Sequence, residues 1–255
     1  MTVAEFRAPA HWRAIDFLSD LHLSEGTPRT FDAWAAHLRR APADAVFMLG
    51  DLFEAWVGDD ARTSGFELRC AEVLRDAATR RTLAFMVGNR DFLVGAELLG
   101  ECGVVQLADP TVLVAFDQRL LLSHGDALCL EDTEYQRFRA QVRSEPWRAA
   151  VLARPLAERR ALAQAMRDAS EQRRQKMAAE LWADVDASAA VQWLTDARST
   201  TLIHGHTHRP RSEPLAPGFV RHVLSDWDLE DDAQPKRAEV LRFTAQGLER
   251  RAPDA

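Results

Sequence analysis

Short apolar runs along the sequence end repeatedly on polar residues of the types that bind metal ions. Four of these runs are AIDFLSDLH with Asp20 and His22, VFMLGD with Asp51, LAFMVGN with Asn89, and LLLSH with His124. A fifth run, TLIHGHTH, carries His206 and His208. Such runs, bounded by polar or glycine positions, are typical of buried strands, and in open α/β sheets functional groups lie just beyond the carboxyl ends of strands. We therefore expect these seven side chains to converge on one rim.

Helical patterns occupy the intervals between the predicted strands. The three intervals that separate the first four strand ends have lengths that fit one crossover helix each, returning to the sheet. Residues 29–41 and 65–81 place apolar positions at helical spacing in the first two intervals. The tail from Arg221 on is expected to return as strands of a second sheet.

The interval before the fifth run has a different character. Residues 134–194 show helical periodicity, interrupted at Pro146 and Pro155. We expect this segment to form a helical cap inserted over the rim. Residues 1–133 and 195–255 are then expected to form the α/β core.

The candidate ligands form a mixed nitrogen and oxygen set. Imidazoles, carboxylates and one amide oxygen suit Mn²⁺, Fe²⁺, Zn²⁺ or Co²⁺ better than the all-oxygen shell of Ca²⁺ or the thiolate shell of structural zinc. Seven ligands are too many for one catalytic metal that keeps an open position, so we expect two metals and one bridging carboxylate. Asp51 is the candidate bridge, because it stands alone at its strand end while Asp20 and His22 form a pair.

Two of the motifs contain a pair of candidate ligands separated by one residue, and this spacing predicts their direction if the backbone is extended. In Asp-Leu-His and in His-Thr-His, the outer two side chains are predicted to point to the same face, because side chains alternate along an extended segment. A lone Asp-x-His or Gly-Asp motif is weak evidence for a site, since short motifs have a high false-positive rate, whereas Gly-His-Thr-His after a buried run is stronger evidence. All five in chain order, each at a strand end, favour a metal site over a purely structural role.

Charge is distributed unevenly. The net charge of −7 argues against nucleic acid as the main partner, because neutralising phosphates requires a basic face. Residues 134–180 nevertheless contain eleven Arg and Lys against six acidic residues, a net charge of +5. This basic segment is either a solvated helical face with i,i+4 ion pairs or a face that meets an anionic membrane surface.

The sequence also indicates where the chain resides. No run approaches the length of apolar segment that spans a bilayer, and residues 1–13 lack the apolar core of a signal peptide, so we expect a cytoplasmic location. Cys70, Cys102 and Cys129 are widely spaced, which favours reduced thiols over a disulfide or a zinc site.

The motif order DLH, GD, GNRD, HGD and GHTH resembles that of the calcineurin-like metallophosphoesterases, and the resemblance covers roughly residues 14–230. It implies a two-sheet sandwich flanked by helices, with two metals in the site. By the family pattern, one Mn²⁺ is expected at Asp20, His22, Asp51 and His208, and a second Mn²⁺ at Asp51, Asn89, His124 and His206.

Longer strings are similar to one branch of this family. SDLHLS, GDLFEAWVGDD, GNRDFL, SHGDALCLEDTEYQ and HGHTHRP resemble the enzymes that hydrolyse the pyrophosphate of UDP-2,3-diacylglucosamine in lipid A biosynthesis. The resemblance implies that water attacks the α-phosphorus, giving UMP and 2,3-diacylglucosamine 1-phosphate. It also implies a peripheral position on the cytoplasmic face of the inner membrane and no obligate protein partner. Arg90 stands where most of the superfamily has a histidine, which favours a pyrophosphate substrate.

Residue roles follow from the same resemblance. The expected catalytic residues are Asp51, Asn89, Arg90 and His124. The expected substrate contacts are Asn89, Arg90, Asp132, Tyr135, Ser170 and His206, with Arg174 and Lys176 in place of an asparagine and a lysine of the family. Asp126 is expected to orient a metal-binding histidine. Apolar cap residues such as Trp147, Val151 and Leu152 either pack the cap or line a groove for acyl chains.

Two other functions fit the same scaffold. A phosphomonoesterase, phosphodiesterase or dinucleoside polyphosphate hydrolase would have been favoured by GNHD in place of GNRD and by a short polar cap. A non-enzymatic scaffold that binds protein partners would be expected to have lost metal ligands, whereas all seven are present. Metal identity, acyl-chain preference and oligomeric state are not determined by these patterns.

Overall fold

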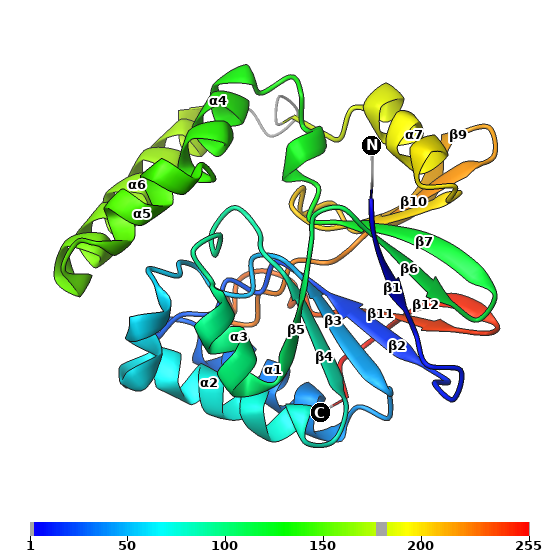
Figure 1. Cartoon of the computed structure of the whole chain (residues 1–255), viewed down its shortest axis with the longest axis horizontal. Coiled ribbons are helices and arrows are strands. Elements are labelled where there is room, and N and C mark those ends of the chain that lie inside the picture. Colours follow the sequence, from blue (N-terminus) through cyan, green and yellow to red (C-terminus); the bar gives the residue numbers. More distant parts are fainter. Residues whose placement is uncertain (1–2, 177–182, 255) are drawn as a thin grey trace.

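The computed structural model describes residues 3–176 and 183–254. Two six-stranded sheets pack face to face, and helices cover their outer faces (Figure 1). This architecture confirms the predicted two-sheet sandwich flanked by helices.

The first sheet is mainly parallel. In spatial order it contains β12 (Gly247–Arg251), β11 (Val240–Thr244), β2 (Ile15–Leu18), β3 (Ala45–Leu49), β4 (Thr82–Met86) and β5 (Val104–Leu107). Strands β2 to β5 are parallel, while β11 runs antiparallel to β2. Parallel neighbours require crossover connections. These are made by α1 (Pro28–Arg40), α2 (Gly65–Ala78) and α3 (Ala96–Cys102).

The second sheet is mixed. In spatial order it contains β1 (Ala4–Arg7), β6 (Thr111–Ala115), β7 (Gln118–Ser123), β8 (Thr201–His204), β10 (Phe219–Val223) and β9 (Arg211–Ala216). The chain begins in this sheet with β1 and returns to it through the antiparallel pair β6 and β7. The interval before His124 was therefore predicted wrongly as one crossover helix, because it also holds β5, β6 and β7 and moves the chain to the second sheet.

The tail was predicted only partly correctly. Strand β10 does lie in the second sheet, but β11 and β12 extend the first sheet at the free edge of β2. The register pairs Leu241 with Phe17 and Phe243 with Ile15. All four of these side chains are buried between the sheets, and their burial explains why the edge of the first sheet is favoured.

Alternation along the strands divides the core into layers. Phe17 and Phe47 lie between the two sheets, whereas their neighbours Leu18 and Met48 face α1 and α2. A third apolar cluster lies on the outer face of the second sheet, under α7 (Ala187–Asp196). The order of layers is thus helices, first sheet, second sheet, helix, which places the carboxyl ends of strands from both sheets along one rim.

Three helices stand over this rim (Figure 1). They are α4 (Thr133–Val142), α5 (Glu145–Leu152) and α6 (Leu156–Lys176), and we call them the cap helices. Pro146 lies in the first turn of α5 and Pro155 directly precedes α6, where a proline costs no helical hydrogen bond. Helix α7 falls inside the predicted cap segment 134–194 but packs on the second sheet.

Some basic residues of the cap helices pair with acidic residues of the core. Arg159 donates to the Val57 carbonyl at 2.5 Å and to Asp60, and Arg160 pairs with Glu67 at 3.0 Å. The positive charge of the cap is therefore used in part to hold it against the acidic loops of the core. The basic side chains of the cap helices therefore do not all point to solvent, and they do not all point to a membrane.

Two further sequence expectations concern membranes and cysteines. Within the described ranges, no helix combines the length and apolarity needed to cross a bilayer. Cys70, Cys102 and Cys129 are free and buried, as expected for thiols with a packing role.

Candidate active site

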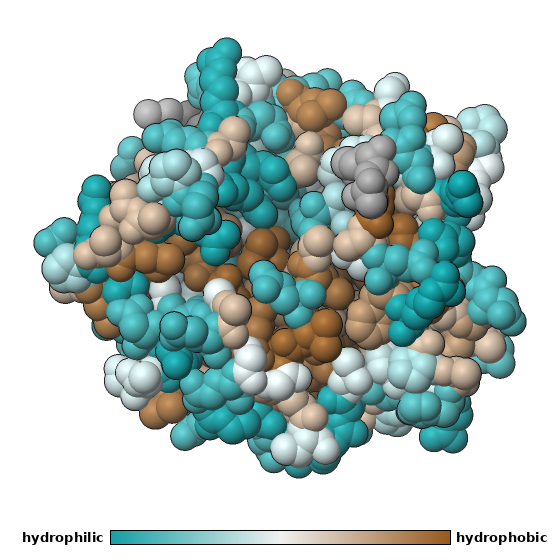
Figure 2. All heavy atoms as spheres, viewed as in Figure 1, coloured by the Kyte–Doolittle hydropathy of each residue, from teal (hydrophilic) through white to brown (hydrophobic). Residues whose placement is uncertain are grey.

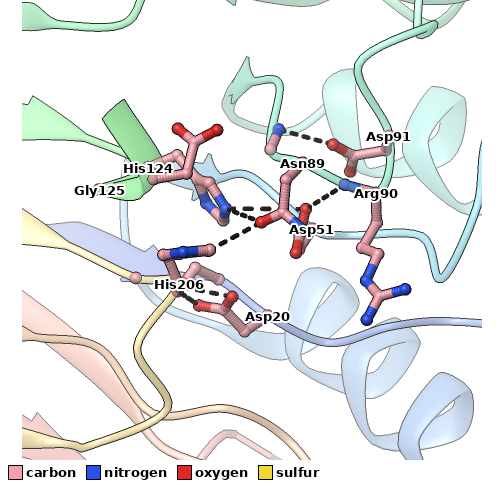
Figure 3. Close-up of polar contacts among 12 residues, drawn as sticks. Asp20, Asp51, Asn89, Arg90, Asp91, His124, Gly125 and His206 are labelled. Atoms are coloured by element: carbon pink, nitrogen blue, oxygen red, sulfur yellow. Dashed lines mark hydrogen bonds and ion pairs between the residues drawn. The ribbon is translucent and has the colours of Figure 1, made fainter. Parts of the chain in front are cut away.

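The seven predicted ligands come together at the rim, each just beyond the end of a strand. Asp20 and His22 follow β2, Asp51 follows β3, Asn89 follows β4, His124 follows β7, and His206 and His208 follow β8. Figure 3 shows Asp20, Asp51, Asn89, His124 and His206 directed toward one another. Residues of the two sheets, up to 188 positions apart, therefore share one small volume.

The backbone at the rim is not extended. Five of the seven residues have positive φ: Asp20 at 56°, His22 at 50°, Asp51 at 54°, His206 at 66° and His208 at 52°. Such φ values are strained for residues other than glycine, and strain of this kind concentrates at functional sites. The extended backbone predicted for the Asp-Leu-His and His-Thr-His motifs was therefore wrong, although their outer side chains do reach the same site. Residues with left-handed backbone conformation after the strands direct the ligand side chains toward one another instead.

One group of side chains gathers around Asp20. His208 Nε2 lies 3.4 Å from Asp20 Oδ1 and 3.3 Å from His22 Nε2. The carboxylate of Asp20 also accepts the backbone N–H of His206 at 2.9 Å and the Ser19 hydroxyl at 2.5 Å. One ligand atom from each of Asp20, His22 and His208 fits within a 4.8 Å separation, which is close enough to hold one cation.

A second group gathers around Asn89. Its Oδ1 lies 2.9 Å from His124 Nε2 and 2.8 Å from His206 Nδ1, and Asp51 Oδ1 lies 3.7 Å from His124 Nε2. Asp20, Asp51 and His124 also have ligand atoms within 4.8 Å of one another. The two groups therefore adjoin, and Asp20 belongs to both by distance. The expectation that Asp51 is the bridge remains a prediction.

The donors and acceptors of this second group fit a bound cation. His124 Nδ1 is 2.9 Å from the carbonyl of Leu49, so in the neutral ring, the form that can bind a metal, Nδ1 carries the proton and Nε2 presents its lone pair. That lone pair faces the Asn89 oxygen, itself an acceptor, with the Asp51 carboxylate beyond it. Several lone pairs directed at one point repel each other unless a cation lies among them. The residues present thus fit divalent metal ions.

Burial and charge set the protonation of the group. Burial alone would raise the pKa of Asp20, but His208, His124 and His22 outweigh it and hold that pKa far below its usual range. Burial would lower the pKa of His124, yet the carboxylates of Asp51 and Asp20 raise it to about 9. Burial and the neighbouring His124 lower the pKa of His206 to about 4. The Asp20 carboxylate is therefore ionised at neutral pH, as a metal ligand must be.

Glu54 is a residue of the site that sequence patterns did not single out. Its Oε2 lies 3.0 Å from His22 Nδ1, and its Oε1 lies 2.6 Å from Arg167 Nε and 3.6 Å from Arg90 Nη1. Arg167 Nε makes no hydrogen bond among the described residues, so its contact with Glu54 is an ion pair. Burial would raise the pKa of Glu54, but contact with His22 and the charges of Arg90 and Arg167 lower it to about 2. Glu54 thus ties a candidate ligand to Arg90 and to the cap.

Asp91 is a second such residue. It is fully buried and accepts the backbone N–H groups of Gly88 at 2.7 Å and of Leu52 at 2.8 Å, as Figure 3 shows in part. It thereby joins the loops that carry Asn89 and Asp51. Burial and the charge of Asp51 raise the pKa of Asp91 to about 7. The sequence offered one indication of this role, which is that Asp91 lies in the GNRD motif, two residues after the candidate ligand Asn89.

Asp126 has a different role from the one predicted. It contacts no histidine by hydrogen bond. Its Oδ2 accepts from the Tyr135 hydroxyl at 2.6 Å, from Arg139 Nε at 2.8 Å and from Arg143 Nη2 at 3.2 Å. Asp126 therefore anchors α4 at the rim. Its place in HGD, just after a ligand, suggested a partner for that ligand, but its carboxylate pairs with these three side chains instead.

The predicted substrate contacts lie at different distances from the rim. Asp132 caps α4 by accepting from the Tyr135 backbone N–H at 2.9 Å, and the Tyr135 ring stacks on His206 with centroids 5.9 Å apart. Ser170 is an exposed residue of α6 that faces the same cavity as Asn89 and Arg90. The side chains of Arg174 and Lys176 lie outside the described part of the structure.

His204 does not join the cluster, although it begins the same motif. It is fully buried, and its Nδ1 lies 2.9 Å from the carbonyl of Gly205. Burial lowers the pKa of His204 to about 4. Its role is therefore in packing at the end of β8.

A cavity lies between the cap helices and the core, and we call it the cap cavity. It measures about 90 Å³ and is lined mainly by apolar side chains, with Asn89 and Arg90 at the end that meets the rim. Trp147 packs on Phe92 with ring centroids 5.8 Å apart, and Val151 is buried. Figure 2 shows apolar residues gathered in the hollow between the cap helices and the core. Leu152, in contrast, is 40% exposed.

Comparison with known proteins agrees with this geometry. The family described as calcineurin-like phosphoesterase matches residues 14–210. The chain is 44% identical over 221 residues to a protein of Chromobacterium violaceum named UDP-2,3-diacylglucosamine hydrolase, covering 84% of this chain and 90% of that one. Proteins of the same name from Bordetella pertussis and Xanthomonas campestris are 39% and 41% identical, and each comparison covers 91% of this chain and more than nine-tenths of the relative. The chain belongs to the calcineurin-like phosphoesterase family.

Proposed function

We propose that this protein hydrolyses the pyrophosphate bond of UDP-2,3-diacylglucosamine, giving UMP and 2,3-diacylglucosamine 1-phosphate, a step of lipid A biosynthesis. The proposal rests on nearly full-length similarity to curated hydrolases of that name, in a chain that retains every candidate ligand at one rim. The apolar cap cavity that adjoins this rim supports a substrate with acyl chains.

The proposed cofactors are two Mn²⁺ ions, one at Asp20, His22, Asp51 and His208 and one at Asp51, Asn89, His124 and His206. Two such cations, when bound, supply hydroxide at neutral pH and stabilise the charge that develops on phosphoryl oxygens. The residues of the chain prepare this chemistry before substrate binds. Glu54 orients His22 at 3.0 Å, and the Leu49 carbonyl orients His124 at 2.9 Å, so that the other nitrogen of each ring faces the cluster.

Arg90 is proposed to neutralise the pyrophosphate. Its side chain extends away from Asp51, as Figure 3 shows, while its backbone N–H donates to Asp51 Oδ1 at 2.8 Å. A planar guanidinium can bind two phosphoryl oxygens at once, which a histidine at this position could not do. Tyr135, stacked on His206, closes the other side of the site.

The acyl chains are proposed to enter under the cap. Pockets for small organic ligands usually measure about 300 to 1,000 Å³. The cap cavity, at about 90 Å³, is much smaller, so two acyl chains require α5 and α6 to separate from Phe92 and Leu93. Each buried methylene contributes roughly 0.8 kcal/mol toward that opening.

Association with the cytoplasmic face of the inner membrane is part of the proposal. Its support is the amphiphilic substrate together with exposed apolar residues on the cap side, Phe138 at 38% and Leu152 at 40%. Replacing both by serine should weaken binding to anionic phospholipid vesicles. Unchanged vesicle binding would contradict this part alone.

A product assay tests the reaction. The protein loaded with Mn²⁺ is offered UDP-2,3-diacylglucosamine, UDP-glucose and bis-p-nitrophenyl phosphate, and we expect rapid release of UMP from the first only. In ¹⁸O-labelled water the label should enter UMP, because water attacks the α-phosphorus. Label in the sugar phosphate would refute that site of attack. Preference for bis-p-nitrophenyl phosphate would favour a general phosphodiesterase instead.

A further inference from the structure

A second cavity lies beside the cap cavity and has no role in the reaction described so far. It measures about 400 Å³, within the usual size range of small-molecule sites. Four segments distant in sequence form its walls: residues 23–25, just after His22, residues 53–55, residues 64–67 at the start of α2, and Arg160 with Arg167 on α6. We call it the second cavity.

The wall between the two cavities is the ion pair of Glu54 and Arg167. Both residues line both cavities, and Glu54 Oε1 lies 2.6 Å from Arg167 Nε. The other carboxylate oxygen of Glu54, Oε2, lies 3.0 Å from His22 Nδ1. Arg90 Nη1 lies 3.6 Å from Glu54 Oε1. The dividing wall is thus attached to the metal rim and carries two guanidinium groups. Both cavities thus reach the neighbourhood of the rim, because Asn89 and Arg90 line the cap cavity and Leu23, directly after His22, lines the second cavity.

The two cavities differ in chemistry. Trp147, Val151 and Met166 are typical of the lining of the cap cavity, which suits acyl chains. The lining of the second cavity mixes hydroxyl, carboxylate, guanidinium and phenyl groups, from Ser24, Glu25, Phe53, Ser64, Phe66, Glu67 and Arg160. Such a lining suits a neutral nucleoside, because carboxylates accept hydrogen bonds from ribose hydroxyls and serine hydroxyls can pair with the polar edge of a base.

We propose that the second cavity is the subsite for the nucleoside of the substrate, so that the Glu54–Arg167 pair separates the lipid half from the uridine half. This inference rests on the proposed function for the identity of the nucleoside, but the cavity itself does not depend on it. In this arrangement the ribose hydroxyls donate to Glu25 and Glu67, and UMP leaves through the second cavity while the sugar phosphate remains under the cap.

Filling each cavity separately tests the proposal. Ser64 is exposed and makes no capping hydrogen bond to α2, so Ser64→Trp should fill the second cavity without loss of a structural contact. Glu25→Trp fills it from the opposite wall. Ala163→Trp fills the cap cavity, and Ser188→Trp, on the exposed surface of α7, is a matched control outside both.

Binding of UMP to the Mn²⁺-loaded protein is measured by calorimetry, alongside inorganic phosphate and 2,3-diacylglucosamine 1-phosphate. Ser64→Trp and Glu25→Trp should each raise the Kd for UMP at least tenfold and leave the Kd for phosphate and for the lipid product unchanged. Ala163→Trp should raise the Kd for the lipid product and leave the Kd for UMP unchanged. Ser188→Trp should leave the Kd values for UMP, phosphate and the lipid product unchanged. Metal content, measured in every variant, should stay the same.

The result that overturns the proposal is a wild-type protein that binds UMP no more tightly than phosphate, or filling variants with wild-type affinity for UMP. This outcome is separate from failure of the proposed function. A protein that loses UMP affinity on filling but does not cleave UDP-2,3-diacylglucosamine retains the nucleoside subsite and loses only the assigned substrate.

Discussion

Substitution of Gly88 by alanine tests whether the position of Asp51 controls metal binding. An added Cβ at Gly88 would lie 2.8 Å from Asp51 Cγ and closer still to its Oδ1 and backbone nitrogen. Ordinary contact begins at 3.4 Å, so Asp51 must move by at least the difference between 3.4 and 2.8 Å, which is 0.6 Å. Metal–ligand distances tolerate only about 0.2 Å. We therefore expect Gly88→Ala to lower kcat/KM about 100-fold or more.

The assay combines three measurements on the same variant. Metal content by elemental analysis should fall below two equivalents, circular dichroism of the metal-free protein should show that the fold persists, and turnover of UDP-2,3-diacylglucosamine should drop. Gly100→Ala is the matched control, because nothing lies within 4 Å of a Cβ there, on α3. It should raise the free energy of unfolding by roughly 0.5 to 1 kcal/mol and leave turnover unchanged. A Gly88→Ala protein with two metals and full turnover would refute the reasoning.

Three further predictions address metal, pyrophosphate and stability. Asp51→Ala should lose both metal equivalents and most turnover, whereas His11→Ala, on the exposed surface, should lose neither; equal metal content in the two by elemental analysis would contradict this. Arg90→Ala should reduce kcat/KM by the equivalent of about 1.5 to 3 kcal/mol at unchanged metal content, because it loses a charged hydrogen bond to the pyrophosphate; a change under twofold would remove Arg90 from that role. Arg242 donates to buried Asp16 at 2.6 and 2.7 Å, so Arg242→Met should reduce the free energy of unfolding by roughly 3 to 5 kcal/mol in urea at pH 7. Burial would raise the pKa of Asp16, but Arg242 and His37 outweigh it and lower that pKa. The ionised Asp16 carboxylate therefore stabilises the fold above its unfolded pKa of about 3.9, and this stabilisation is lost as pH falls below that value. A difference in unfolding free energy between wild type and Arg242→Met that stays constant down to about pH 2 would refute this assignment.

The candidate ligands could be found from the sequence because strand ends are local features. A short apolar run predicts a buried strand, and a polar residue directly after it lies at the carboxyl end, whatever the rest of the fold does. Asp51 after β3 and His124 after β7 follow this rule, although they belong to different sheets. The prediction held even where the assumed path of the chain between them was wrong.

Other features depended on residues far apart in sequence, and only the tertiary structure decided them. Which sheet β11 joins depends on how Leu241 and Phe243 are buried, and either sheet edge is compatible with their local pattern. The left-handed φ of His206 and His208 is uncommon for residues other than glycine, and the local sequence did not predict it.

The ion-pair partners of charged residues show most clearly what the sequence could not predict. Sequence spacing suggested that Asp126 orients a histidine and that the basic cap faces solvent or membrane. Asp126 instead holds Arg139 and Arg143, and Glu54 holds Arg167 from more than a hundred positions away. A charge has no local signature of its partner, because electrostatic pairing depends on distance in space and on burial rather than on separation along the chain. The sequence therefore identified the candidate metal ligands and roughly where the strands lie, and the tertiary structure alone determined how the cap, the dividing wall and the two cavities are arranged around them.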